Sequence, residues 1–307
     1  MKRIGMIALF VFCLVLLGSE IFLRRKYGFC DAVLIEENLK YEYIAKPNQS
    51  RFRFGNQISY NSMSMRSPEI DKTARIIFGF GDSVLNGGTQ TDDDSLASTI
   101  LTTSLSRLYQ EKIQFLNISA GSWGPDNCFA YLKEHIDFHG EAIYLFVSSH
   151  DAYDNMNFMK IVGVNPSFPS EQYKIAIWEL LDRYLIPWFK KKTRISKHKV
   201  SYSDLGINKK KDGDKFNSGF LDLYQYSVAN RIPLIIYLHA EKSELGNRSY
   251  NKQGQEIIMF AQQHDIPLIQ DLGILDGNDY RDNIHINEMG QRKMADLVLN
   301  YIASKDN

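Results

Sequence analysis

The sequence predicts an α/β fold in which helices cover both faces of a parallel sheet, preceded by one helix that spans a membrane. From residue 74 onward, apolar runs of strand length alternate with stretches of helical spacing. The runs are apolar throughout, which is typical of parallel strands buried on both faces. At the N-terminus, the 20-residue apolar run Ile4–Leu23 is long enough to cross the roughly 30 Å hydrocarbon core of a bilayer.

The N-terminal segment, residues 1–26, has two interpretations. The apolar run contains a single charge, Glu20. Gly18 and Ser19 are small, as a signal-peptide cleavage site requires, but no A-x-A pattern is present and three basic residues follow directly. We therefore favour an uncleaved anchor over a signal peptide. Positive charges flank both ends of the run, so they do not fix its orientation.

The rest of the chain divides into an extension, residues 27–73, and a main domain, residues 74–307. The extension is expected to form short strands or loops that pack on the main domain. In the main domain the pattern predicts strands at 74–80, 113–118, 142–147, 233–238 and 267–269, and helices at 95–110, 251–263 and 287–304. In such sheets the functional residues lie beyond the carboxyl ends of the strands.

An insertion at residues 170–215 interrupts this alternation. Residues 171–189 have helical spacing and include Trp178, Tyr184 and Trp188. Residues 190–215 carry ten Lys or Arg against three Asp. We favour a surface helix followed by a solvated loop. The alternative is an interfacial or lid element, because aromatic residues beside a basic cluster suit an anionic membrane surface.

Charge and cysteine usage exclude some classes of protein. The formal net charge is zero, so the basic balance of a nucleic-acid-binding protein is missing and no nucleic-acid partner is expected. Cys13, Cys30 and Cys128 do not have metal-ligand spacing, so no metal site is expected. Cys30 and Cys128 could pair in an oxidising compartment, although unpaired thiols are the favoured interpretation.

A candidate nucleophile follows the first predicted strand of the main domain. Gly81-Asp82-Ser83 places a serine at the carboxyl end of that strand, beside small residues that leave its hydroxyl and its N–H exposed. Such a serine becomes a nucleophile only when a base takes its proton. The tripeptide alone is also typical of an ordinary turn or helix N-cap.

A candidate base lies near the other end of the chain. Asp282-Asn283-Ile284-His285 places a carboxylate three residues before an imidazole, just ahead of the last predicted helix. A carboxylate that accepts one ring N–H fixes the tautomer and leaves the other nitrogen facing the serine. A capping Asp beside a surface His is the alternative. The two motifs together indicate a Ser–His–Asp triad more strongly than either does alone.

These two motifs, in this order, resemble the first and last blocks of the SGNH (GDSL-type) hydrolase family over about residues 74–304. The resemblance implies a flavodoxin-like α/β/α sandwich that hydrolyses or transfers acyl esters without metal or organic cofactor. It implies that Ser83 is the nucleophile, His285 the base and Asp282 its orienting partner. The Ser83 N–H would be one donor to the oxyanion.

The two middle blocks of the family pattern are altered here. The second block implies a backbone N–H donor to the oxyanion, which is Ser122 by spacing and Gly124 by residue type. The third block, usually Gly-x-Asn-Asp, reads Ser-Ser-His-Asp and places His150 where the side-chain donor belongs. Asn155 is a second candidate for that donor. A structural or substrate-contacting role for His150 remains the alternative.

The N-terminal part resembles a subset of the family that carries one membrane anchor and acts on polysaccharides outside the cytoplasm. Residues 60–67, YNSMSMRS, are similar to a motif that precedes the first block there. We therefore expect a single-pass membrane protein with an extracytoplasmic esterase or O-acyltransferase domain acting on an acylated, and specifically acetylated, glycan. A catalytically weak protein that binds polysaccharide is the alternative. His239, after the fourth strand, either contacts substrate or is a simple loop residue.

Overall fold

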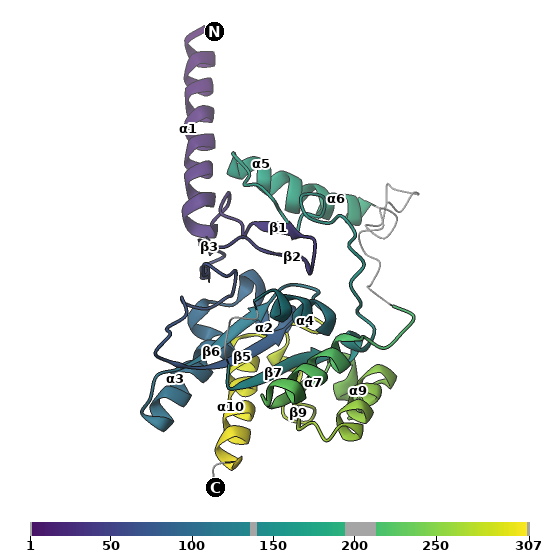
Figure 1. Ribbon diagram of the computed structural model, residues 1–307. Coiled ribbons are helices and arrows are strands. Elements are labelled where there is room, and N and C mark those ends of the chain that lie inside the picture. The colour runs from purple at the N-terminus through teal and green to yellow at the C-terminus, as the bar shows by residue number, and fades with distance from the viewer. Residues whose placement is uncertain (1, 136–139, 194–212, 306–307) are drawn as a thin grey trace.

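The computed structural model describes residues 2–135, 140–193 and 213–305, and its centre is a five-stranded parallel sheet (Figure 1). The strands are, in chain order, β5 (Arg75–Gly81), β6 (Ile113–Ser119), β7 (Ala142–Ser148), β8 (Leu234–His239) and β9 (Leu268–Gln270). Their spatial order, β6-β5-β7-β8-β9, is the flavodoxin-like order with the first strand second in the sheet. The predicted fold class is confirmed.

Two layers of helices cover the sheet because side chains of successive strand residues point to opposite faces. Phe78 and Phe80 of β5 share one core with helices α4 (Pro125–Glu134), α7 (Gly219–Asn230) and α9 (Lys252–Gln263). Phe115 and Phe146 share the other core with α3 (Ala97–Tyr109) and α10 (Glu288–Lys305). Each fully buried side chain of this size contributes about 1.5–3 kcal/mol to folding.

Several short elements lie at the ends of the strands and between the longer helices. The α-helices among them are α2 (Ser83–Asn86) and α8 (Lys242–Asn247). Four 3-10 turns lie at Gly88–Gln90, Asp93–Ser95, Ser149–Ala152 and Gly277–Asp279.

The extension forms two antiparallel hairpins on top of the sandwich. They consist of β1 (Ile35–Asn38) with β2 (Glu42–Ala45), and β3 (Gln49–Arg53) with β4 (Asn56–Tyr60). The second hairpin turns through Phe54 and Gly55, both with positive φ, as tight two-residue hairpins require. Tyr41, Tyr43 and Met65 of the extension belong to the same core as α4 and α7.

The insertion forms one helix of three parts: α5 (Ala176–Leu180), a π-helical turn (Leu181–Leu185) and α6 (Ile186–Thr193). The helix begins five residues later than the spacing predicted. Residues 171–175 are not helical because the Gln172 side chain exchanges two hydrogen bonds with the backbone of Ala32. Most of the basic cluster predicted at 190–215 lies outside the described residues.

The N-terminal helix α1 (Lys2–Tyr27) extends away from the sandwich (Figure 1). Its segment Arg3–Tyr27, which contains an 18-residue window with a mean hydropathy of 2.6, is long and apolar enough to cross a membrane. A signal sequence at this end of the chain would have the same character. Within the part of the chain that the structure describes, Cys13, Cys30 and Cys128 form no disulfide.

Candidate active site

The carboxyl ends of the parallel strands bring the candidate residues to one edge of the sheet. The register pairs Gly81 of β5 with Ser119 of β6 on one side and with Phe146 of β7 on the other. The strands β5 and β6 therefore end at the same level, and β7 continues two residues further, to Ser148. Ser83 follows β5 and His150 follows β7, which places both at the point where the strand order reverses and ligands bind in such sheets.

Ser83 is the first residue of α2, directly after the strand. The Asp82 side chain caps this short helix by accepting a hydrogen bond from the N–H of Val84 at 2.8 Å. A Cβ on Gly81 would lie 3.0 Å from the Leu85 side chain and 3.1 Å from the Phe146 carbonyl oxygen. The glycine therefore allows the strand end and the helix to approach closely, and the serine is presented at the turn between them.

His285 and Asp282 meet Ser83 from the loop before α10. Nε2 of His285 lies 2.9 Å from Oγ of Ser83, and Nδ1 lies 2.7 Å from Oδ2 of Asp282. The ring is 43% exposed and the carboxylate 58% exposed, so both remain accessible. The structure thus brings together the three residues that the sequence singled out as nucleophile, base and orienting acid.

Asp282 is held as an anion by the loop that carries it. Partial burial raises the pKa of this carboxyl, but hydrogen bonds from the backbone N–H groups of Ile284 and His285 and from the His285 ring outweigh the burial. The net result is a pKa below its ordinary value. The Asp282 carboxylate can therefore stabilise a proton gained by His285.

Arg66, which the sequence analysis quoted only as part of a motif, organises the loop after Ser83. Its buried guanidinium donates to the carbonyl oxygens of Asn86, Gly88 and Thr91, and it pairs with Asp93. A single planar cation thus satisfies three backbone acceptors of a loop with little regular structure of its own. The motif at residues 60–67 was the available signal for this role.

Of the two predicted backbone donors in the second block, Gly124 is already engaged in another hydrogen bond. The N–H of Gly124 already donates to Oδ1 of Asn127 at 2.9 Å, within the N-terminal cap of α4. Position 124 is glycine for packing, because a Cβ there would lie 2.0 Å from the carbonyl oxygen of Asp154. Ser122 is exposed and adopts φ 57°, a conformation in which glycine is least strained.

Tyr43 of the extension fixes the loop that contains Ser122. Its hydroxyl donates to the carbonyl oxygens of Gly121 at 2.8 Å and Ser122 at 3.2 Å. Its own carbonyl oxygen accepts from the indole N–H of Trp123 at 2.9 Å. The extension therefore supports the site on two sides, through Tyr43 and through Arg66.

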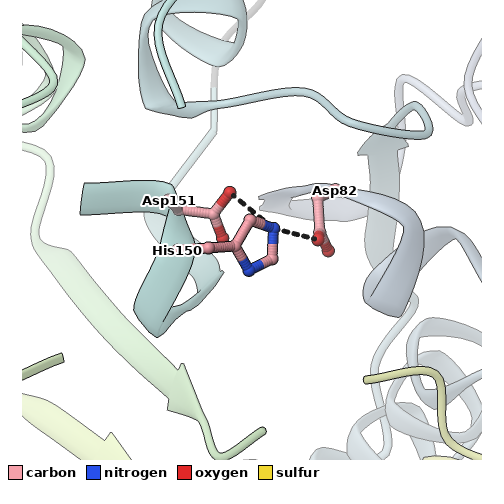
Figure 2. Close-up of side chains that lie close together, drawn as sticks. All are labelled: Asp82, His150 and Asp151. Atoms are coloured by element: carbon pink, nitrogen blue, oxygen red, sulfur yellow. Dashed lines mark ion pairs between the residues drawn. The ribbon is translucent and has the colours of Figure 1, made fainter. Parts of the chain in front are cut away.

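His150 lies among carboxylates (Figure 2). Its Nε2 is 3.7 Å from Oδ1 of Asp151 and 4.0 Å from Oδ2 of Asp82, and its Nδ1 is 3.4 Å from Oε1 of Glu241. Burial lowers the pKa of the ring, but the neighbouring carboxylates, Asp151 first, raise it to about 10. The protonated ring is therefore favoured, next to the residue that precedes Ser83.

Asp82, His150 and Asp151 also offer ligand atoms that lie within 4.8 Å of one another, as a cation site would. The Oδ1 atom of Asp151 is buried without a hydrogen-bond partner, and burial raises the pKa of this carboxyl well above its usual range. A metal ion and a proton would compete for Nε2 of His150, since only the neutral ring binds metal. The raised pKa of the ring therefore opposes metal binding at this nitrogen.

Two other predicted side chains are engaged elsewhere. The Asn155 amide donates to the carbonyl oxygens of Tyr153 at 3.1 Å and Lys215 at 2.9 Å, so it holds a loop instead of facing Ser83. His239 is 1% exposed, and both of its ring nitrogens face acceptors. Its Nδ1 lies 2.6 Å from Oδ2 of Asp271, and its Nε2 lies 2.9 Å from the carbonyl oxygen of Ile284. His239 therefore supports the residue before His285 and is closed to substrate.

The chain was compared with family models, with curated proteins and with solved structures. No family model and no curated protein matches the chain. Among solved structures, a two-domain esterase active on acetylated mannans is 10% identical, with a TM-score of 0.46 over 75% of this chain. The match spans 49% of that esterase.

Two further solved structures are similar to this chain. An esterase from Pseudoalteromonas is 12% identical over 76% of this chain and 100% of its own, with a TM-score of 0.45. A lipolytic G-D-S-L family protein from Veillonella parvula is 12% identical over 74% and 97%, with a TM-score of 0.38.

Proposed function

We propose that this chain is a membrane-anchored serine esterase or O-acyltransferase that uses Ser83, His285 and Asp282. The observation that carries the proposal is the continuous hydrogen-bonded series from Ser83 Oγ to His285 Nε2, at 2.9 Å, and from His285 Nδ1 to Asp282 Oδ2, at 2.7 Å. A nucleophile, a base within reach of it and a carboxylate that orients the base are the requirements for acyl transfer through a covalent intermediate.

The first half-reaction is acylation of Ser83. As Oγ forms a bond to the acyl carbon, its proton passes to Nε2 of His285, and the Asp282 carboxylate stabilises the imidazolium. The carbonyl oxygen gains negative charge in the tetrahedral intermediate. Collapse of the intermediate breaks the ester bond, and His285 returns the proton to the departing alcohol oxygen. The product of this half-reaction is an acyl ester on Ser83.

The second half-reaction removes the acyl group from Ser83. His285 takes a proton from the attacking oxygen and returns it to Ser83 Oγ as the acyl bond breaks. Water as the attacking molecule gives hydrolysis, and a sugar hydroxyl gives transfer. The chemistry at Ser83 is the same for both.

The negative charge that develops on the carbonyl oxygen must be stabilised by hydrogen-bond donors. The backbone N–H groups of Ser83 and Ser122 are the proposed hydrogen-bond donors. The His150 imidazolium would add positive charge beside Asp82. Removing one hydrogen-bond donor from a site that binds the oxyanion in this way costs about 2.7–4 kcal/mol of transition-state stabilisation.

We also propose a substrate class and a location for the catalytic domain. An acetylated glycan as substrate, and an extracytoplasmic catalytic domain, rest on the resemblance of residues 60–67 and on the apolar helix α1. Deleting residues 1–26 should release the chain from membranes. A shortened chain that still sediments with membranes would place the attachment elsewhere in the protein.

The experiment that tests the nucleophile is Ser83→Ala, assayed with p-nitrophenyl acetate. The variant should lose turnover and keep its melting temperature, because Ser83 is at the surface of a turn and its hydroxyl is required for the covalent step. Wild-type activity in the variant would remove Ser83 from the mechanism.

A second candidate function is polysaccharide binding with weak catalysis. The observation in its favour is that His150 faces carboxylates, where the family pattern has a neutral amide. One experiment distinguishes polysaccharide binding from catalysis. A binding protein would retain an acetylated glycan with unchanged affinity after Ser83→Ala and would show no turnover before the substitution.

A further inference from the structure

The helix of the insertion has a face of large apolar side chains that the body of the protein does not cover. We call residues 176–193 the aromatic helix. Trp178 and Leu181 are three residues apart, and Trp188 and Phe189 come after the π-helical turn; all four side chains are exposed. Trp178 is 53% exposed, Trp188 51% and Phe189 55%. Large exposed apolar side chains gathered on one helix are typical of an interaction surface.

The opposite face of the aromatic helix is fixed to the extension by a buried ion pair. Glu179, which is fully buried, binds the guanidinium of Arg53 and accepts a hydrogen bond from the N–H of Cys30 at 2.6 Å. Arg53 also donates to the carbonyl oxygen of Gly28. Since these contacts set the rotation of the helix, the apolar face is held pointing away from the body.

The aromatic helix starts beside the end of the apolar segment of α1 (Figure 1). The carboxylate of Glu20 accepts hydrogen bonds from the N–H groups of Ala176 at 2.8 Å and Ile177 at 3.0 Å. Arg24 pairs with Glu20 and donates to the carbonyl oxygen of Lys174. The one charge within the apolar run of α1 is therefore satisfied by the start of the aromatic helix.

The length of α1 indicates how deep in the bilayer the contact between Glu20 and the aromatic helix lies. The 20 apolar residues Ile4–Leu23 match the hydrocarbon thickness of a bilayer, so Leu23 marks its edge. Glu20 is three residues earlier, which is about 5 Å inside that edge at 1.5 Å per residue. Amphipathic helices in the membrane plane bury their apolar face to a depth of about 5–10 Å. Glu20, and with it the start of the aromatic helix, therefore lies at the depth expected of a helix in the membrane plane.

We propose that the aromatic helix lies in the plane of the membrane and inserts its exposed face into the headgroup boundary of the bilayer that α1 spans. The occupant is a phospholipid surface with anionic headgroups, because Arg24, Arg25 and Lys26 lie at the same level on α1. Asp182 is the acidic residue on the exposed side, and its carboxylate accepts a hydrogen bond from the Tyr173 hydroxyl. The proposal rests on the anchoring role given to α1 under Proposed function.

This arrangement orients the catalytic edge. The hairpins of the extension lie between the aromatic helix and the sheet (Figure 1), and the same extension contacts the loops after β5 and β6 through Arg66 and Tyr43. Two helices attached to one bilayer, one across it and one along it, remove the freedom to tilt that a single anchor leaves. The carboxyl edge of the sheet is then held toward the membrane side of the molecule.

The test uses the full chain in vesicles of phosphatidylcholine and phosphatidylglycerol, with some lipids brominated at shallow or deep carbons of the acyl chain. The protein has three tryptophans: Trp123, which is 1% exposed, and Trp178 and Trp188 of the aromatic helix. Because α1 contains no tryptophan, its insertion adds nothing to the signal. Bromine should quench the emission, shallow bromine more than deep, and lipid should protect the emission from acrylamide.

The matched control is Trp178→Phe with Trp188→Phe, which should abolish quenching by bromine while the chain still floats with vesicles and keeps its melting temperature. A wild-type chain that floats but shows no bromine quenching, with acrylamide still reaching Trp178 and Trp188, would overturn the proposal and leave the anchor intact. A chain that does not float would overturn both. Protection from acrylamide without lipid, together with a dimer in detergent, would assign the face to a second copy and also overturn the proposal.

Discussion

Two aspartate–histidine pairs lie near one another at the carboxyl edge of the sheet, and they differ in what the second ring nitrogen meets. In the Asp282–His285 pair that nitrogen meets the hydroxyl of Ser83, and the ring is 43% exposed. In the Asp271–His239 pair it meets the carbonyl oxygen of Ile284, and the ring is 1% exposed. A hydroxyl can give up a proton, whereas a carbonyl oxygen can only accept a hydrogen bond.

This difference assigns the two pairs to different tasks. Both nitrogens of His239 face acceptors, an arrangement that favours the protonated ring with its two N–H groups. Burial lowers the pKa of His239, but the Asp271 carboxylate and the Ile284 carbonyl raise it by more. Asp271 also accepts hydrogen bonds from the N–H of Ala240 and from the Tyr237 hydroxyl. The buried pair thus holds the loop, and the exposed pair is free to exchange protons.

The largest expected effect is on the exposed pair. His285→Ala should lower kcat for p-nitrophenyl acetate by roughly 10⁴–10⁶-fold, because nothing then removes the proton of Ser83. The melting temperature should stay close to that of the wild type, since the ring is 43% exposed. Steady-state kinetics and thermal unfolding give the two numbers. Retention of more than a tenth of wild-type kcat would contradict the assignment of His285 as the base.

The next effect is on stability and belongs to the buried pair. Asp271→Asn leaves the His239 cation without its anion, and we expect the free energy of unfolding to fall by about 3–5 kcal/mol, measured with urea. The matched change in the exposed pair, Asp282→Asn, should leave the stability almost unchanged and lower kcat by about 10⁴-fold. Similar stability losses for the two variants would mean that the pairs do not differ as described.

His150 is a third histidine near the site and belongs to neither pair. Its substitution tests how much of the catalytic rate depends on it. His150→Ala should lower kcat by about 10²–10³-fold with little change in KM, because its charge acts on the developing oxyanion. His150→Asn restores an amide where the family pattern has one, and it should retain more activity than the Ala variant. Equal kcat in the wild type and both variants would remove His150 from the site.

The smallest effect is the pH dependence of the buried pair. The pKa of His239 is higher in the folded chain than in the unfolded chain, where it is about 6.5. Its contribution to stability is therefore complete below about pH 6.5 and is lost as the pH rises through the folded-state pKa. The difference in unfolding free energy between the wild type and His239→Gln should shrink over that range. A difference that grows with pH would show that the ring is buried neutral.

The sequence predicted those parts of the fold and site that depend on local pattern. All five strands of the sheet were predicted to within one residue at each end, because each is a short apolar run between polar loops. Ser83 and the Asp282–His285 motif could be predicted as site residues because each follows a predicted strand or precedes the last helix.

The parts that could not be predicted depend on contacts between distant segments. Gly124 was a reasonable donor by residue type, but its N–H is used by Asn127 and its lack of a side chain is required by the nearby Asp154 backbone. His239 carries no sequence signal of burial, because its partner Asp271 lies 32 residues away. Arg66 and Tyr43 likewise act on loops that the chain reaches only after the extension has ended.

The position of Arg66 has a consequence for protein engineering. Its acceptors, the carbonyl oxygens of Asn86, Gly88 and Thr91, form the segment that a designer would transplant to move the nucleophile turn into another scaffold. Moved without residues 60–67, that segment would lose the shared donor of its three carbonyl groups, at a cost of about 1–3 kcal/mol for each of the two that are buried, those of Asn86 and Thr91. The smallest portable unit is therefore discontinuous: the strand-and-turn around Ser83 together with the extension that precedes it.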